Sequence, residues 1–349
     1  MKAPANAIKR RSGSINGHTL LMLITIVLFI LLYAGGCIAY ADKNFTRVQT
    51  FLNILRSSAG LICVTCGMTC VMLTGGIDIS VGSLIALDCM ILAMGMGDWG
   101  FSAVVSMVLV LVLGIAFGLC QGFCVGYLQI QPFIVTMAGM FFARGMTAVI
   151  STDQLSITAE SSQWFYDLAN YRIYLPFGGY VNKAGKMVMP YIGWGVVVAF
   201  VVLIAIFLVL RYTRFGRSLY AVGGNEQSAA MMGLNVKKTK MLAYVLASFL
   251  CSIGGICYAM NTMSANVNQA TGLEMDAISS CVIGGTLLTG GVGNVLGSLF
   301  GVLINGTISS IVQTNGKLAS SWPNILTAIL LCFFIVLQSV FAILKDRKK

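Results

Sequence analysis

The sequence predicts an all-α integral membrane protein, a bundle of about ten transmembrane helices in which two glycine-rich repeats break the helices. The first observation is composition: 58% of residues are hydrophobic and 9% are charged, against about 45–50% and about 25% in soluble proteins. The second is a mean hydropathy of +0.89, carried by apolar runs long enough to cross a bilayer. The third is a pair of similar glycine-rich segments that interrupt those runs.

Ten apolar segments fill residues 19–344, which we predict to be one transmembrane domain between the polar tails 1–18 and 345–349. A span needs roughly 17–25 residues, so two of the segments, near 81 and 275, are marginal. The first segment is longer than the roughly 7–15 residues of a signal-peptide core, and we expect it to remain as an anchor. The ten segments are 19–41, 51–73, 81–97, 101–128, 133–150, 191–210, 241–263, 275–288, 295–312 and 322–344.

The basic residues predict how the chain is oriented. Lys and Arg concentrate in the loops and tails on the cytoplasmic side of membrane proteins. If both tails are cytoplasmic, the number of spans is even, and ten spans place 211–240 on the cytoplasmic side as well. Fourteen of the 22 basic residues then lie on that side, so the charge indicates orientation in the lipid bilayer and no nucleic-acid binding. They are Lys2, Lys9, Arg10, Arg11, Arg211, Arg214, Arg217, Lys237, Lys238, Lys240, Lys345, Arg347, Lys348 and Lys349.

The segment Thr74–Leu84 is repeated at Thr289–Leu299: aligned without gaps, the two share Thr, Gly, Gly, Gly, Ser and Leu. Irregular backbone persists at membrane depth only where it is buried in protein or lines a watery cavity. Paired broken segments are typical of transport pathways, and chance similarity in a glycine-rich chain is the alternative. From the number of spans, we predict that the chain turns at the cytoplasmic side of the membrane in both repeats. We predict pathway side chains at Thr74, Asp78, Ser80, Ser83 and Asn294, and pathway backbone at Gly75, Gly76, Gly82, Gly290, Gly291 and Gly297.

Four ionisable residues are predicted to lie within the membrane, where such groups are rare and functional by default: Arg56, Asp78, Asp88 and Arg144. Asp78 is the strongest candidate because it lies within the first repeat. Two roles remain open for it, contact with substrate hydroxyls or capping of the following helix. The arginines can pair with either aspartate. In the second repeat Gly293 replaces Asp78, so the repeats are not equivalent.

Two longer connections interrupt the spans. The external one, 151–190, is polar and aromatic, and it either caps the bundle or docks an extracytoplasmic partner. In the cytoplasmic one, 211–240, Asn225 is a suitable N-cap and Gly233 a suitable helix end. We therefore expect a helix of about seven residues that docks a soluble partner, or else an ordinary amphipathic connector. Its predicted exposed residues are Ala229, Met231 and Met232.

Catalytic and metal chemistry have little support in the sequence. Eleven cysteines lie almost wholly in apolar segments, and Cys63 and Cys66 are interpreted as packing residues. His18 is the single histidine, so we predict neither a metal site nor an enzyme. The phosphate-binding pattern G-x-x-x-x-G-K-[ST] is missing from the sequence, so we predict no bound cofactor.

The sequence contains three ordered motifs, which are Leu73–Ser83, Arg214–Arg217 with Ala221–Glu226, and Met275–Ile278 with Val282–Thr286. They resemble the bacterial sugar permeases of ATP-binding-cassette importers, the group with ribose, xylose, galactose and autoinducer-2 permease subunits. The resemblance extends from about residue 20 to 345. Within the group, Pro132–Phe142 and Gly284–Gly293 are most similar to galactofuranose permease subunits.

The resemblance implies a multi-pass subunit of the bacterial inner membrane. Two permease subunits, identical or paralogous, would form the pathway for a monosaccharide such as galactofuranose or a related pentose or hexose. A periplasmic sugar-binding protein would deliver the sugar, and a separate ATPase subunit would bind ATP. Gln227 stands where the family often has a second acid. The resemblance implies that the ATPase contacts Gly223, Gly224, Asn225, Glu226, Ala229, Ala230 and Gly233.

Two other function classes are weaker. A secondary transporter with its own ion coupling ordinarily has more buried acids or histidines, and its transport would persist without ATP. A membrane-embedded enzyme needs a nucleophile–base pair or a metal-ligand cluster, and the sequence shows neither.

Overall fold

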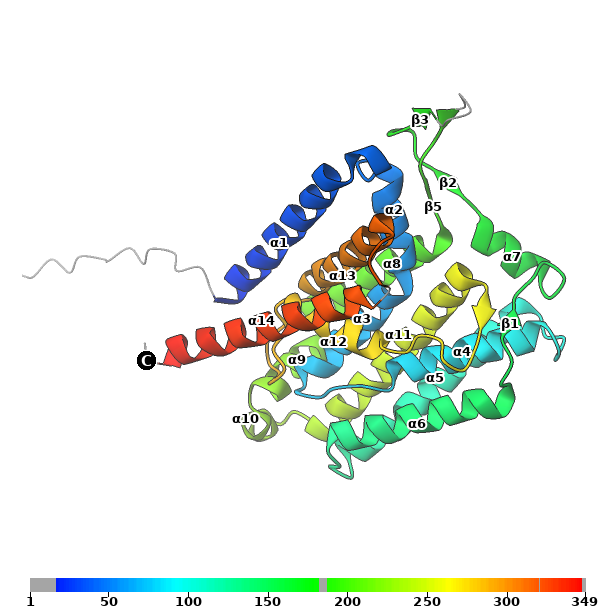
Figure 1. The fold of residues 1–349 in the computed structure, drawn as a ribbon. Helices are drawn as coiled ribbons and strands as arrows, with labels where there is room; N and C mark the ends of the chain where they lie inside the picture. Colours follow the sequence, from blue (N-terminus) through cyan, green and yellow to red (C-terminus); the bar gives the residue numbers. More distant parts are fainter. Residues whose placement is uncertain (1–16, 182–186, 320, 347–349) are drawn as a thin grey trace, which may run out of the picture.

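The computed structural model describes residues 17–181, 187–319 and 321–346, and its all-helical bundle confirms the predicted fold class (Figure 1). Within the described residues, seven helices are long and apolar enough to cross a membrane, and the number is eight if the pair α2–α3, bent by 54°, forms one span. The helices are α1 (Gly17–Ala39), the 3₁₀ helix η1 (Ala41–Lys43), α2 (Val48–Ser57), α3 (Ala59–Leu73), α4 (Val81–Met96), α5 (Ala103–Gly126), α6 (Pro132–Ile150), α7 (Gln163–Asn170), α8 (Trp194–Tyr212), α9 (Arg214–Gly224), α10 (Glu226–Met231), α11 (Val236–Thr262), α12 (Leu273–Ile283), α13 (Val295–Asn315) and α14 (Trp322–Asp346).

The two marginal spans of the sequence are the short helices α4 and α12, of 16 and 11 residues. Neither reaches the roughly 20 residues needed to cross a bilayer as a helix. An extended segment over residues 76–80 precedes α4, and irregular backbone over 284–294 follows α12. These segments coincide with the glycine-rich repeats, so the predicted helix breaks are present at both repeats.

The centre of the bundle is α3, which packs against α11. Every residue of α3 except Leu61 is buried, as expected for a helix that is apolar all round. Small residues let the two backbones approach each other: a methyl group at Gly67 would lie 2.8 Å from Ala247 Cα. By contrast, only 17% of the most apolar stretch of α1 and of α14 is buried, as at the outside of a membrane bundle.

The connection 151–190 holds α7 and three short antiparallel strand pairs that involve it. The pair β1–β6 ties this connection to the residues that follow α11. Figure 1 shows both ends of the described chain on the side of the bundle that carries α10, with strands β2–β5 on the opposite side. We call these two sides the α10 end and the strand end. The strands are β1 (Leu155–Ser156), β2 (Ile173–Tyr174), β3 (Tyr180–Val181), β4 (Met187–Val188), β5 (Tyr191–Ile192) and β6 (Ser264–Ala265).

The connection 211–240 contains two helices where the sequence analysis predicted one. The additional helix, α9, buries Leu219 and Val222. With Phe215, these residues follow the i, i+4, i+7 spacing of one helix face, a signal that could have identified α9 from the sequence.

Candidate functional site

The two helix breaks contact each other directly. The Gly291 amide donates a hydrogen bond of 2.9 Å to the Leu73 carbonyl oxygen. A methyl group added at Gly290 would lie 2.7 Å from the Gly75 nitrogen. Gly290 and Gly291 also have φ angles of +85° and +75°, which other residues rarely adopt. Glycine is therefore required at these positions both for the turn and for the contact between the repeats.

The end of α9 joins the same contact. A methyl group at Gly223 would overlap the Leu73 carbonyl oxygen and lie 2.5 Å from the Gly291 nitrogen. The Tyr220 hydroxyl donates to the Gly293 carbonyl oxygen at 2.9 Å. The connection between α8 and α11 is thus held against both helix breaks. We call this contact the glycine junction, made by Leu73–Gly75, Gly223–Gly224 and Gly290–Gly291.

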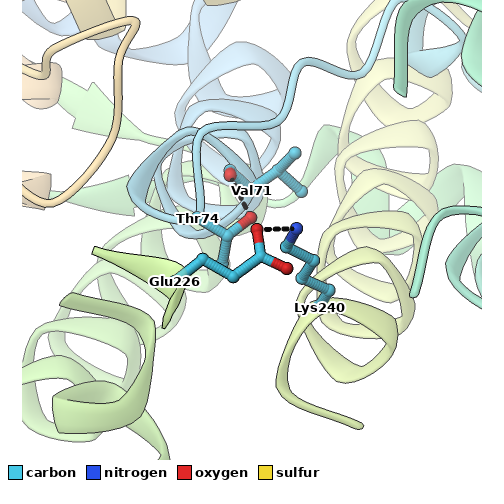
Figure 2. A network of polar contacts seen from close by, with 4 residues as sticks. All are labelled: Val71, Thr74, Glu226 and Lys240. Atoms are coloured by element: carbon cyan, nitrogen blue, oxygen red, sulfur yellow. Dashed lines mark hydrogen bonds and ion pairs between the residues drawn. The ribbon is translucent and has the colours of Figure 1, made fainter. Parts of the chain in front are cut away.

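Helix α10 follows the junction and begins as the sequence predicts. The Asn225 side chain accepts a hydrogen bond of 2.7 Å from the Ser228 amide, which makes Asn225 the N-cap. Gly233, with φ at +80°, lies just beyond the helix end. The Glu226 carboxylate forms an ion pair of 2.6 Å with Lys240 of α11, which Figure 2 shows beside Thr74. This pair fastens the start of α10 to the second turn of α11.

The prediction that Ala229 is exposed was wrong. Ala229 is fully buried against Val222 and Val236, because α10 folds back on the end of α9 and the start of α11. Ala230 is exposed. Met231 and Met232 are 89% and 70% exposed, as predicted, so both are accessible apolar side chains.

A cavity of about 430 Å³ opens between the first break and α10. Thr74, Gly75 and Gly76 line it on one side, the start of α6 on another, and the Glu226–Lys240 pair closes a third. Its size lies within the roughly 300–1,000 Å³ typical of small-molecule sites. The Thr74 hydroxyl is oriented by its hydrogen bond of 2.8 Å to the Val71 carbonyl oxygen (Figure 2).

Asp78 lies in the extended segment, 1% exposed. One of its carboxylate oxygens accepts hydrogen bonds from the Ser80 amide at 2.9 Å and the Ser80 hydroxyl at 2.6 Å. The Gln121 amide donates to the same hydroxyl at 3.0 Å. Asp78 thus organises the turn that precedes α4, whereas the N-cap of that helix is Ser80 and no side chain caps its first amides. The Tyr244 hydroxyl donates to the Ile77 carbonyl at 3.3 Å and satisfies backbone that is irregular inside the bundle.

The remaining predicted pathway residues lie away from that cavity. Ser83 is buried in α4, Gly82 faces the Glu274 carboxylate, and Gly297 packs on the Gly284 backbone. Asn294 caps α13, because its side chain accepts a hydrogen bond of 3.0 Å from the Leu296 amide. Of the predicted residues, Thr74, Gly75, Gly76 and Glu226 line this cavity. Gly223, Gly290 and Gly291 do not line it, but they contact the first break at the glycine junction.

The intramembrane arginines do not pair with the buried aspartates. Arg144 donates to the carbonyl oxygens of Val267 and Gln269 at 2.6 and 2.8 Å. Over the described ranges, Glu226–Lys240 is the single ion pair. Sequence reasoning missed Lys240 and Gln121 as site residues. Gln121 could have been identified from the sequence, because it is a polar side chain within a predicted span. Lys240 could not, because it is one of six basic residues in the connection 211–240.

Comparison with known proteins identifies the family. The protein-family model described as "Branched-chain amino acid transport system / permease component" matches residues 50–337 of the chain. The inner membrane ABC transporter permease protein YjfF of Escherichia coli (strain K12) is 40% identical, over 94% of each chain. The fructose import permease protein FruG of Bifidobacterium longum is 33% identical over 99% of each chain. The ribose import permease protein RbsC of Bacillus subtilis is 36% identical over 89% of each.

No solved structure matches the chain significantly. The relatives confirm the resemblance to sugar permeases of ATP-binding-cassette importers, and they are transport proteins rather than enzymes. The chain is accordingly a permease, and it belongs to the family of branched-chain amino acid transport system permease components.

Proposed function

We propose that this chain is the membrane-spanning subunit of an ATP-binding-cassette importer that moves a monosaccharide across the bacterial inner membrane. The observation that carries the proposal is the glycine junction, because it connects both helix breaks to α9 and, through Asn225, to α10. A partner that moves α10 would act on the two breaks at once. The relatives named for fructose and ribose import support the sugar class.

The chemistry of the cavity beside Thr74 favours a neutral substrate. A branched-chain amino acid carries an ammonium and a carboxylate group, and buried charges need partners. The two charged residues in the lining, Glu226 and Lys240, already neutralise each other. A pentose or hexose needs hydrogen bonds instead, which Thr74 and the Gln129 and Gln131 side chains can supply. Galactofuranose is the candidate that the motif resemblance favours.

We propose that the α10 end faces the cytoplasm, with both chain termini. Arg211, Arg214, Arg217, Lys237 and Lys238 belong to or adjoin the helices at this end. Basic residues beside membrane spans are retained on the cytoplasmic side. The strand end then faces the periplasm, where α7 and the short strands offer a surface for a sugar-binding protein.

The ATPase subunit would dock on α10. Met231 and Met232 provide exposed apolar side chains there, and aromatic residues and methionine are enriched at protein interfaces. Glu226 faces Lys240 and the cavity, so its role is to couple α10 to α11. A second permease subunit, a copy of this chain or a paralogue, would complete the pathway.

Reconstitution tests this function. Proteoliposomes would contain the permease and its ATPase, with ATP inside and the binding protein outside, and uptake of labelled ribose, fructose and galactofuranose would be measured. We expect uptake of one sugar that stops when the ATPase or the binding protein is omitted. A permease that accumulates leucine or isoleucine, and none of the sugars, would contradict the proposal.

A further inference from the structure

A second cavity, of about 260 Å³, opens at the strand end of the bundle. It lies between the bend that joins α2 to α3, the last turns of α11, the start of α12, the second half of α13 and the first turn of α14. It shares no lining residue with the cavity beside Thr74. Its side-chain lining is Ser57, Ser58, Leu61, Tyr258, Ala270, Thr271, Leu273, Asp276, Asn305, Ser309, Gln313, Pro323, Asn324 and Thr327.

The lining is rich in hydroxyl and amide groups and contains one charged side chain, that of Asp276. Over the described ranges, no hydrogen bond or ion pair engages the Asp276 carboxylate. A carboxylate is an acceptor that binds ligand hydroxyls well. An anionic ligand would be repelled, since the cavity has no basic residue. The groups present therefore suit a small neutral ligand with many hydroxyls.

The inner wall of this cavity is held in place by its own hydrogen bonds. The Asn305 amide of α13 donates to the hydroxyls of Ser279 and Ser280 of α12 at 3.1 and 3.0 Å. The Thr327 hydroxyl of α14 donates to the Asn305 carbonyl oxygen at 3.3 Å. Three helices are thus joined beneath the cavity by side chains that are nearly fully buried. A preformed polar wall of this kind lowers the entropic cost of binding.

Apolar surface completes the site. Tyr258, Leu61 and Pro323 contribute carbon-rich faces, against which the C–H face of a sugar ring can pack. Gln313 and Asn324 are exposed, so they stand at the mouth. The volume is slightly below the roughly 300–1,000 Å³ of sites for drug-sized ligands, which fits a ligand as small as one monosaccharide.

We propose that this cavity is a monosaccharide-binding subsite on the uptake side, which the sugar occupies before it reaches the helix breaks. The inference rests on the proposed function for the substrate class and for the direction of transport. Asp276 would accept hydrogen bonds from the sugar hydroxyls, Asn324 and Gln313 would contact the sugar at the mouth, and Tyr258 would face its ring.

The first test uses uptake kinetics in the reconstituted importer. Asp276→Asn and Asn324→Ala should each lower uptake at limiting sugar by about tenfold, the cost expected for lost hydrogen bonds to a bound ligand. Asn324 is exposed, so its truncation leaves the fold intact. Asp98→Asn is the matched control, because Asp98 is an exposed acid in the connection from α4 to α5 and lines neither cavity. Wild-type uptake in both subsite variants would overturn the subsite.

The second test needs no ATPase. A thiol placed at Ser309→Cys lines the cavity, and its rate of modification by a membrane-impermeant reagent would be measured with ribose, fructose or galactofuranose present or absent. The parent chain, with its own cysteines, gives the background. We expect the transported sugar to slow the modification several-fold; equal rates with that sugar present and absent would contradict the subsite while transport itself stands. A wild-type chain that imports no sugar at all in the reconstituted importer would instead contradict the proposed function.

Discussion

The Gly291 amide is hydrogen-bonded to the Leu73 carbonyl oxygen at 2.9 Å, so one repeat of the glycine-rich motif holds the last residue of the helix that enters the other. Gly223, at the end of α9, closes on the same carbonyl oxygen. The three segments come from distant parts of the chain, and two of them reach the Leu73 carbonyl oxygen with a glycine, which has no side chain to hold the backbones apart. In the proposed coupling, motion of α9 would reach both helix breaks through these backbone contacts.

Gly223 and Gly224 offer a matched pair to test this junction. A methyl group at Gly223 would overlap the Leu73 carbonyl oxygen, whereas one at Gly224 would meet nothing within 4 Å. Gly223→Ala should cost about 1–3 kcal/mol of stability, as overpacked sites do, and abolish most ATP-driven uptake. Gly224→Ala should behave as the wild type. Thermal unfolding in detergent and vesicle uptake measure the two effects; equal behaviour of the variants would contradict the junction.

The Glu226–Lys240 pair predicts a charge-exchange result. Its side chains are 50% and 22% exposed, so the pair should contribute only about 0–1 kcal/mol to stability. Glu226→Lys places two positive charges side by side, and we expect uptake to fall while the protein remains inserted. Exchange of both residues should restore uptake. If Glu226 instead contacts the ATPase, the exchanged protein would stay as impaired as the single variant.

The exposed methionines of the α10 end predict where the ATPase binds. Met231→Glu changes a side chain that is 89% exposed, so stability should be unchanged. Co-purification of the ATPase should nevertheless be lost, because a charge would face an apolar interface. Met187→Glu is the control, since Met187 is 69% exposed on β4 and lies outside the α10 end. Loss of the ATPase from both variants, or from neither, would refute α10 as the docking site.

The hydrogen bonds of Asp78 predict different uptake by two variants, Asp78→Asn and Asp78→Ala. Asn keeps an acceptor for the Ser80 amide, whereas Ala removes it, and a hydrogen bond of this kind contributes about 0.5–1.5 kcal/mol to stability. Asp78→Asn should therefore retain most of the uptake and Asp78→Ala should lose it, at equal amounts of inserted protein. Equal loss in both variants would show that the charge itself is required, as in direct contact with substrate.

The sequence was sufficient to predict those features that depend on residues close together in the chain. The breaks at the two repeats, the Asn225 cap and the Gly233 helix end depend on residues within a few positions of one another. Ala229 was misjudged, because its burial depends on α10 folding back against Val222 and Val236. The Gly291–Leu73 contact and the Glu226–Lys240 pair could not be predicted, since they join separate segments of the chain whose packing the sequence pattern does not specify.

The energy source is the most direct test of the central claim, that a separate ATPase acting on α10 drives sugar through this chain. Labelled sugar uptake would be followed in proteoliposomes containing the whole importer, either with internal ATP and no ion gradient or with a proton or sodium gradient and no ATP. We predict uptake in the first condition and none in the second. Uptake that follows the ion gradient and ignores ATP would contradict it and identify a secondary transporter.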